Sequence, residues 1–218
     1  SPDALYRNMF VHKRLTLYKE SGQVYDIMRM NIYAKDGFRE FEGINVVEGQ
    51  AETLDAILKN GEIDTICVHF LDYHMWGVLK NYLDTMRIIV WIHGAEIQPW
   101  WRRTFNYKTE AELEKAKKES DIRMDFWKEV FEAANEANIH FVFVSEYFAG
   151  EVMEDYKINL LPEQHSVIHN CIDIKMFNYI PKTPEQRTKI FSVKPYTSAK
   201  YANDLTTKAI LELSKDAD

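Results

Sequence analysis

The sequence contains few cysteines, few glycines and no long apolar run. The two cysteines among 218 residues, Cys67 and Cys171, are too few for the disulfide framework of a small secreted domain. Cys67 lies inside the apolar run ICVHF, so we expect a buried, reduced thiol and a cytoplasmic setting. No stretch approaches the roughly 20 apolar residues that span a bilayer, and no signal peptide is visible.

Several motifs of known chemistry are also missing. The chain has no GxGxxG, no P-loop, no GxSxG and no CxxC, which counts against a dehydrogenase, a nucleotide hydrolase or a serine esterase. The net charge of -7 argues weakly against a nucleic-acid partner, because phosphates require a cationic surface. What is present, 46% hydrophobic and 28% charged residues, is typical of a globular protein with a sizeable core.

Two kinds of apolar segment alternate along the chain. Apolar side chains at helical spacing predict helices near residues 6–21, 51–60, 74–84, 107–138 and 146–156. Short apolar runs predict strands at residues 24–30, 44–49, 63–70, 87–92, 140–145 and 165–170. Continuous apolar strands separated by helices predict an α/β fold, a Rossmann-like parallel sheet with helices on both faces.

The composition changes near residue 180. Residues 179–188 (YIPKTPEQRT) are polar, contain two prolines and are typical of a linker. A strand at 189–193 and a helix at 201–215 follow, and one strand and one helix cannot bury a core. We therefore expect a first domain at 1–180, and at 181–218 the linker and the first strand–helix unit of a truncated second domain.

Ionisable groups follow the strand at 87–92, where the sequence continues HGAEIQPWWRR. In parallel sheets, ligands bind beyond the carboxyl ends of the strands. His93 precedes a glycine and could approach a substrate closely, although backbone groups could equally satisfy it. Glu96 could orient His93 or accept hydrogen bonds from hydroxyl groups, or it could simply face water.

The same loop continues with aromatic and cationic residues. Trp100 and Trp101 could stack on a sugar ring or pack against a neighbouring helix. Arg102 and Arg103 could hold a phosphate or carboxylate, or form a solvated patch.

The strand at 63–70 also ends in polar residues. Asp72 and Tyr73 follow it, and Asp72 could instead cap the next helix. His69, His74 and His93 lie near strand ends at a spacing that fits no standard zinc motif, so we expect no metal site.

The order of several segments resembles family 4 glycosyltransferases. VFVSEYFAGEVMEDY (142–156) and then HSVIHNCIDIKMF (165–177) resemble the end of the family's first domain, where a turn Asn-Gly-Val-Asp precedes a phenylalanine. Here the turn is NCID at 170–173, so cysteine replaces the usual glycine. RIIVWIHGAE is similar to the strand that ends in the family's active-site histidine, which falls on His93.

The beginning of the family's second domain resembles KIFSVKPYTSAKYANDLTTKAILEL at 189–213. In the family, cationic side chains in this region lie near the donor diphosphate, and Lys194 and Lys200 occupy those positions here. Val193 and Tyr201 replace two of the family's glycines. The family's first strand would precede Ser1, and what remains of its loop would bring Arg7 and Asn8 to the cleft.

The resemblance implies a GT-B fold, of which this chain supplies mainly the acceptor-side domain. It implies retaining transfer of a sugar from a sugar nucleotide to a glycan or lipid-linked acceptor, without cofactor or metal. Catalysis would involve His93. Substrate-binding residues would be Arg7, Asn8, Asp72, Tyr73, Glu96, Trp100, Trp101, Arg102 and Arg103, with Lys194 and Lys200 at the donor diphosphate.

Two other functions are compatible with the same residues. One is a sugar-nucleotide epimerase of GT-B fold, which would need no acceptor pocket. The other is a non-catalytic α/β domain that binds a carbohydrate or a protein partner through its tryptophans and arginines. Peripheral contact with the inner face of the membrane is also compatible with the resemblance, because many relatives work there.

Overall fold

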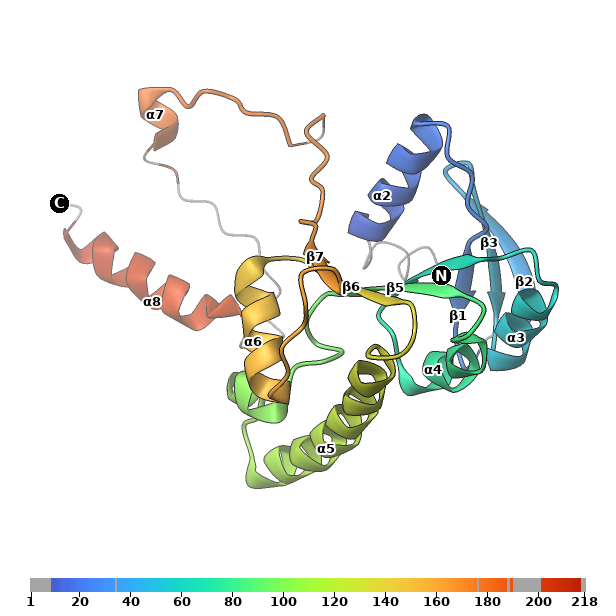
Figure 1. The fold of residues 1–218 in the computed structure, drawn as a ribbon. Helices are drawn as coiled ribbons and strands as arrows, with labels where there is room; N and C mark the ends of the chain where they lie inside the picture. Colours follow the sequence, from blue (N-terminus) through green and yellow to red (C-terminus); the bar gives the residue numbers. More distant parts are fainter. Residues whose placement is uncertain (1–8, 34, 176, 188, 190–200, 217–218) are drawn as a thin grey trace.

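The computed structural model has an α/β architecture and describes residues 9–33, 35–175, 177–187, 189 and 201–216 (Figure 1). Its elements in chain order are α2 (Met9–Glu20), β1 (Met28–Met30), β2 (Gly37–Phe41), β3 (Ile44–Gly49), α3 (Ala51–Lys59), β4 (Thr65–His69), α4 (Tyr73–Leu79), η1 (Lys80–Tyr82), β5 (Arg87–Ile92), η2 (Trp100–Asn106), α5 (Glu110–Ala133), β6 (Ile139–Phe143), α6 (Glu146–Tyr156), β7 (His165–Val167), α7 (Pro184–Arg187), α8 (Asn203–Leu213) and η4 (Ser214–Asp216).

The larger sheet has the strand order β4-β5-β6-β7, and every neighbouring pair is parallel. Helices α4, α5 and α6 lie on one side of this sheet, and α2 lies on the other (Figure 1). The predicted Rossmann-like parallel sheet with helices on both faces is therefore confirmed. Because the strands are parallel, β4, β5 and β6 all end at the same edge, where His69 pairs with Trp91 and Ile92 pairs with Phe143.

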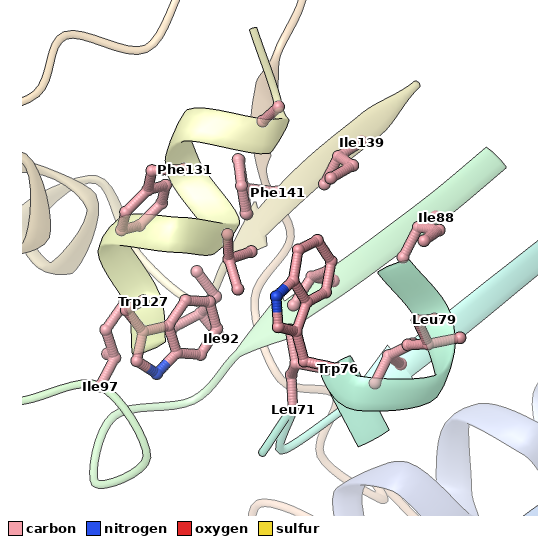
Figure 2. Packing of buried hydrophobic residues seen from close by; sticks show 14 of the residues in the cluster. Leu71, Trp76, Leu79, Ile88, Ile92, Ile97, Trp127, Phe131, Ile139 and Phe141 are labelled. Atoms are coloured by element: carbon pink, nitrogen blue, oxygen red, sulfur yellow. The ribbon is translucent and has the colours of Figure 1, made fainter. Parts of the chain in front are cut away.

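The core lies between the sheet and helices α4, α5 and α6. Ile88, Val90 and Ile92 of β5 point into it and are completely buried. Figure 2 shows the indole of Trp127 and the ring of Phe131, both from α5, packed against this side of the sheet. Burying a side chain of this size stabilises the fold by roughly 1.5–3 kcal/mol, and the helix predicted near residues 107–138 is confirmed as α5.

The prediction that Cys67 is buried is wrong, because its side chain is exposed. Strand β4 is an edge strand of its sheet, and its side chains alternate between the two faces. Val68 points into the core under the helices, whereas Thr65 and Cys67 lie on the opposite face. The apolar run predicted the strand correctly, but it did not show that Cys67 would lie exposed on an edge strand.

A smaller sheet has the order β1-β3-β2, with β1 parallel and β2 antiparallel to β3. Strand β2 (GFREF) was missed, because its side chains are mostly exposed and give little apolar signal. Glu42 and Gly43 join β2 to β3 with φ angles of 49° and 72°, the positive values of a tight hairpin turn. The largely buried Glu48 carboxylate of β3 forms ion pairs with Arg29 of β1 at 3.1 Å and with Arg39 of β2 at 2.8 Å. These ion pairs connect the three strands.

The C-terminal part of the chain lies apart from the larger sheet. Helices α7 and α8 are separated from β7 in Figure 1, and Ile172, Ile174 and Phe177 are exposed. The strand predicted at 189–193 lies almost entirely outside the described residues, so the domain division near residue 180 stays a prediction. Among the helices described, none combines the length and apolar character needed to cross a membrane.

Phe141→Ala tests the core. The side chain is completely buried between α5 and the sheet, so we expect the free energy of unfolding in urea to fall by about 3–5 kcal/mol. Phe177→Ala is the matched control, because that ring is 68% exposed, and it should change the value by less than about 0.5 kcal/mol. Equal effects of the two substitutions would contradict this packing.

Candidate functional site

The loop after β5 holds His93 at the carboxyl edge of the sheet. The backbone N–H of His93 donates to the Glu96 carboxylate, and the Glu96 carbonyl accepts from the indole of Trp127 at 2.8 Å. Gly94 has a φ of +143°, which favours glycine. Glu96 therefore stabilises the turn that presents His93. Burial raises the pKa of Glu96, while backbone N–H groups and the charge of Arg103 oppose this rise.

The imidazole of His93 is paired with a second histidine. His69 Nδ1 lies 2.9 Å from His93 Nε2, and the two rings are nearly parallel with centroids 5.2 Å apart. This contact follows from the register, because His69 pairs with Trp91 and His93 lies two residues further along. One imidazole donates the hydrogen bond and the other accepts it.

Two phenylalanines flank the ring of His93. Phe10 from α2 lies at a centroid distance of 4.7 Å, and Phe70 lies at 4.5 Å. Phe70 follows β4 with a φ of 58°, an uncommon conformation for a bulky residue that costs roughly 1–3 kcal/mol. This backbone turn brings the ring of Phe70 to His93, so the histidine pair has aromatic walls.

Both histidines are neutral at pH 7. Burial, His93 and the cation of Arg14 lower the pKa of His69 to about 3. Burial and Arg14 likewise lower the pKa of His93 to about 4. A neutral imidazole can donate or accept a hydrogen bond but is a weak proton acceptor at this pKa.

Helix α2 contributes residues that were not predicted as part of the site. Phe10 and Arg14 are four residues apart and therefore lie on one face of the helix. Phe10 contacts His93, while the Arg14 guanidinium lies 5.6 Å from the ring centroid of Trp91. Their four-residue spacing marked them as one helix face, but nothing in the sequence placed that face on β5.

Asp72 and Tyr73 follow β4 at the same edge. One carboxylate oxygen of Asp72 accepts hydrogen bonds from the backbone N–H groups of His74 and Met75, each at 2.9 Å. Asp72 is thus the N-cap of α4. The side chain of Tyr73 is 60% exposed and its ring contacts His74, so it is accessible to a ligand.

Trp101 and Arg102 point to α6. Arg102 Nε donates to both oxygens of Asp155 at 3.1 Å, and its guanidinium also pairs with Glu154 at 2.6 Å and Glu151 at 3.3 Å. The indole N–H of Trp101 donates to Asp155 at 3.2 Å. These carboxylates raise the pKa of Arg102, and the contacts tie η2 to α6.

Trp100 contacts α5. Its backbone N–H donates to the buried Ser120 hydroxyl at 3.0 Å, and Lys117 Nζ lies 5.2 Å from its ring centroid. Arg103 is half-buried, and its charge acts on Glu96. The structure thus brings Arg103 towards the His93 loop, while the contacts of Trp100, Trp101 and Arg102 go to helices α5 and α6. Arg7, Asn8, Lys194 and Lys200 lie outside the described residues.

No protein-family model matches this chain, and no curated protein matches it either. The site is therefore interpreted from its geometry.

Arg102→Met tests the tie between η2 and α6. The Asp155 side chain is 6% exposed, so loss of the guanidinium leaves a buried carboxylate without its cation. We expect the free energy of unfolding in urea to fall by about 2 kcal/mol or more. Arg103→Met removes the same charge without that contact, and it should cost about 1 kcal/mol or less, because only the longer-range attraction to Glu96 is lost. A loss for Arg103→Met as large as that for Arg102→Met would refute the tie.

The lowered pKa values of His69 and His93 predict that the folded protein loses stability at acidic pH. In the unfolded chain each imidazole takes up a proton near its ordinary pKa of 6.5, whereas the folded values are about 4 and about 3. Stability should therefore fall as the pH drops from 6.5 towards 4, by at most about 1.4 kcal/mol per pH unit for each histidine. His93→Gln should make the stability curve flatter in this window, as measured by urea unfolding at several pH values. An unchanged slope would contradict the assignment.

Proposed function

We propose that this chain is the acceptor-side part of a retaining glycosyltransferase, which moves a sugar from a sugar nucleotide to a glycan or lipid-linked acceptor. The observation that carries the proposal is the His69–His93 pair at the carboxyl edge of the parallel sheet. Ligands of such sheets bind at this edge. The resemblance of RIIVWIHGAE to the family's active-site strand assigns the same residue independently.

The chemistry of the pair suits a sugar hydroxyl. His93 is neutral at pH 7, and its Nδ1 atom has no hydrogen-bond partner among the described residues. A neutral imidazole can bond to a hydroxyl without placing a full charge beside the substrate. The rings of Phe10 and Phe70 flank the histidine, and aromatic faces match the apolar C–H surface of a sugar.

In this proposal His93 orients the acceptor or the transferred sugar and is not a strong base. Its lowered pKa makes it a poor proton acceptor at pH 7. The proton of the attacking hydroxyl would instead go to the leaving diphosphate. Lys194 and Lys200 would neutralise the charge of that group. The reaction would take place in the cytoplasm, with contact to the inner face of the membrane for a lipid-linked acceptor.

The geometry of the WWRR loop bears on the partner-binding alternative. That alternative needs Trp101 and Arg102 to form an interaction face, yet both bind Asp155 of α6. The epimerase alternative makes the same use of His93 and differs in its product. It would convert the sugar nucleotide itself and would transfer nothing to an acceptor.

His93→Gln tests the proposal in the natural protein that carries this chain. The protein would be incubated with radiolabelled sugar nucleotides and an extract of cellular acceptors. We expect the rate of sugar transfer to fall by about 100-fold, because the substrate loses a positioning contact. His140→Gln is the control, because His140 lies mid-strand in β6 and bonds to Glu163 and Ser166, and it should keep its activity.

Transfer that survives His93→Gln unchanged would refute the role of His93. Analysis of the products separates the alternatives. A labelled glycan or lipid supports the transferase, an isomerised sugar nucleotide supports the epimerase, and binding without turnover supports the non-catalytic domain.

A further inference from the structure

Three nitrogen atoms between α2 and the sheet are buried without a hydrogen-bond partner among the described residues. They are Arg14 Nε, Trp91 Nε1 and His93 Nδ1. Their side chains form one series of contacts. Arg14 lies over Trp91, Trp91 stacks on His69 with a centroid distance of 5.0 Å, and His69 Nδ1 is hydrogen-bonded to His93 Nε2 at 2.9 Å. Trp91 is only 6% exposed, and a buried N–H without an acceptor is costly.

The three nitrogen atoms share one side of the larger sheet. Trp91 and His93 are two residues apart in an extended segment, so both side chains lie on the same face. Helix α2 covers that face, with Phe10 against His93 and Arg14 against Trp91. Lys13 of the same helix pairs with Asp173 at 3.0 Å. The unpartnered atoms therefore lie in the layer between α2 and β5.

The charge of this layer is positive. The Arg14 guanidinium donates to the backbone carbonyl of His169 at 3.3 Å, and it has no carboxylate partner among the described residues. No carboxylate contributes to the lowered pKa of His69 or His93, whereas the Arg14 cation does. The Arg14 side chain is half-buried, and an anion within hydrogen-bond distance would accept from its unpartnered Nε and balance its charge.

The direction of the hydrogen bond between His69 and His93 decides whether His93 Nδ1 is a donor or an acceptor. If His69 Nδ1 donates to His93 Nε2, the neutral ring of His93 carries its hydrogen on Nδ1. In that tautomer, all three unpartnered atoms are donors. An oxyanion beside them would select this tautomer, because it accepts from each donor.

We propose that Arg14, Trp91 and His93 bind a phosphoryl group between α2 and β5. A guanidinium forms paired hydrogen bonds with phosphate, and a tetrahedral oxyanion offers acceptors in more directions than a planar carboxylate does. The proposal rests on the proposed function in one respect. The phosphoryl group would belong to the substrate, as the diphosphate of the donor or the phosphate of a phosphorylated acceptor.

The test is a titration of the protein, labelled with ¹⁵N-histidine, with inorganic phosphate at constant ionic strength set by sodium chloride. We expect the Nδ1 resonance of His93 to shift in a saturable way. Arg14→Gln should raise the dissociation constant by about tenfold or more, because a charge-assisted hydrogen bond is lost. Arg39→Gln is the matched control, because Arg39 pairs with Glu48 in the smaller sheet, and it should leave the constant unchanged.

A second variant keeps the proposal testable if Arg14→Gln does not fold. Trp91→Phe removes the indole N–H but keeps an aromatic ring against His69, and it should weaken phosphate binding several-fold. The absence of a saturable shift of His93 in the unmodified protein would overturn the site. Unchanged binding in both variants, or equal weakening in the Arg39→Gln control, would also overturn it.

Two further titrations identify the source of the phosphoryl group. Tighter binding of a nucleoside diphosphate than of phosphate assigns the site to the donor, and tighter binding of a hexose phosphate assigns it to the acceptor. Equal affinity for phosphate, the nucleoside diphosphate and the hexose phosphate supports a site that recognises only the phosphoryl group. Phosphate binding without any sugar transfer would support the phosphoryl site and contradict the proposed function. Sugar transfer without a phosphate-dependent shift of the His93 resonance would support the proposed function and contradict the phosphoryl site.

Discussion

The parallel pairing of β5 with its two neighbours is the constraint on which the rest of the structure depends. Ile88, Val90 and Ile92 are completely buried on one face, and their packing fixes which way each side chain of the strand points. Because neighbouring residues alternate, a slip of one residue would turn every side chain to the other face. The core therefore also places Trp91 and His93 on the face that α2 covers.

The same constraint explains how the histidine pair forms. The register between β4 and β5 sets His69 beside Trp91, so His93 is the next residue on that face. The 2.9 Å contact between the two rings follows from sheet geometry. Phe70 and Phe10 then enclose His93, one through an uncommon backbone angle and the other from α2. Strand β5 thus both packs in the core and carries His93 at the edge of the sheet.

Local patterns in the sequence were sufficient for most of this architecture. β5 at Arg87–Ile92 and α6 at Glu146–Tyr156 have the predicted bounds, because each has one dominant period and clear ends. The position of His93 at a strand end followed from the same pattern. Asp72 shows the limit, since its spacing allowed both a ligand and a helix cap, and only the structure revealed the cap.

Long-range contacts could not be predicted in this way. Arg102 donates to Asp155, which lies 53 residues further along the chain. The sequence WWRR alone could not show whether Arg102 binds a carboxylate of the protein or a ligand. Phe10 and Arg14 reach β5 only because α2 folds over the sheet. The exposure of Cys67 depends on β4 being at an edge, which is a property of the assembled sheet.

In the proposed function, the substrate sugar binds at the edge of the sheet beside His93. A crystal structure of the natural protein with a sugar nucleotide and an acceptor tests this most directly. It should show an oxygen atom of the bound substrate within hydrogen-bond distance of His93 Nδ1, with Phe10 and Phe70 beside the bound ligand. A ligand bound away from this edge, with the contacts of His93 unchanged, would contradict the account.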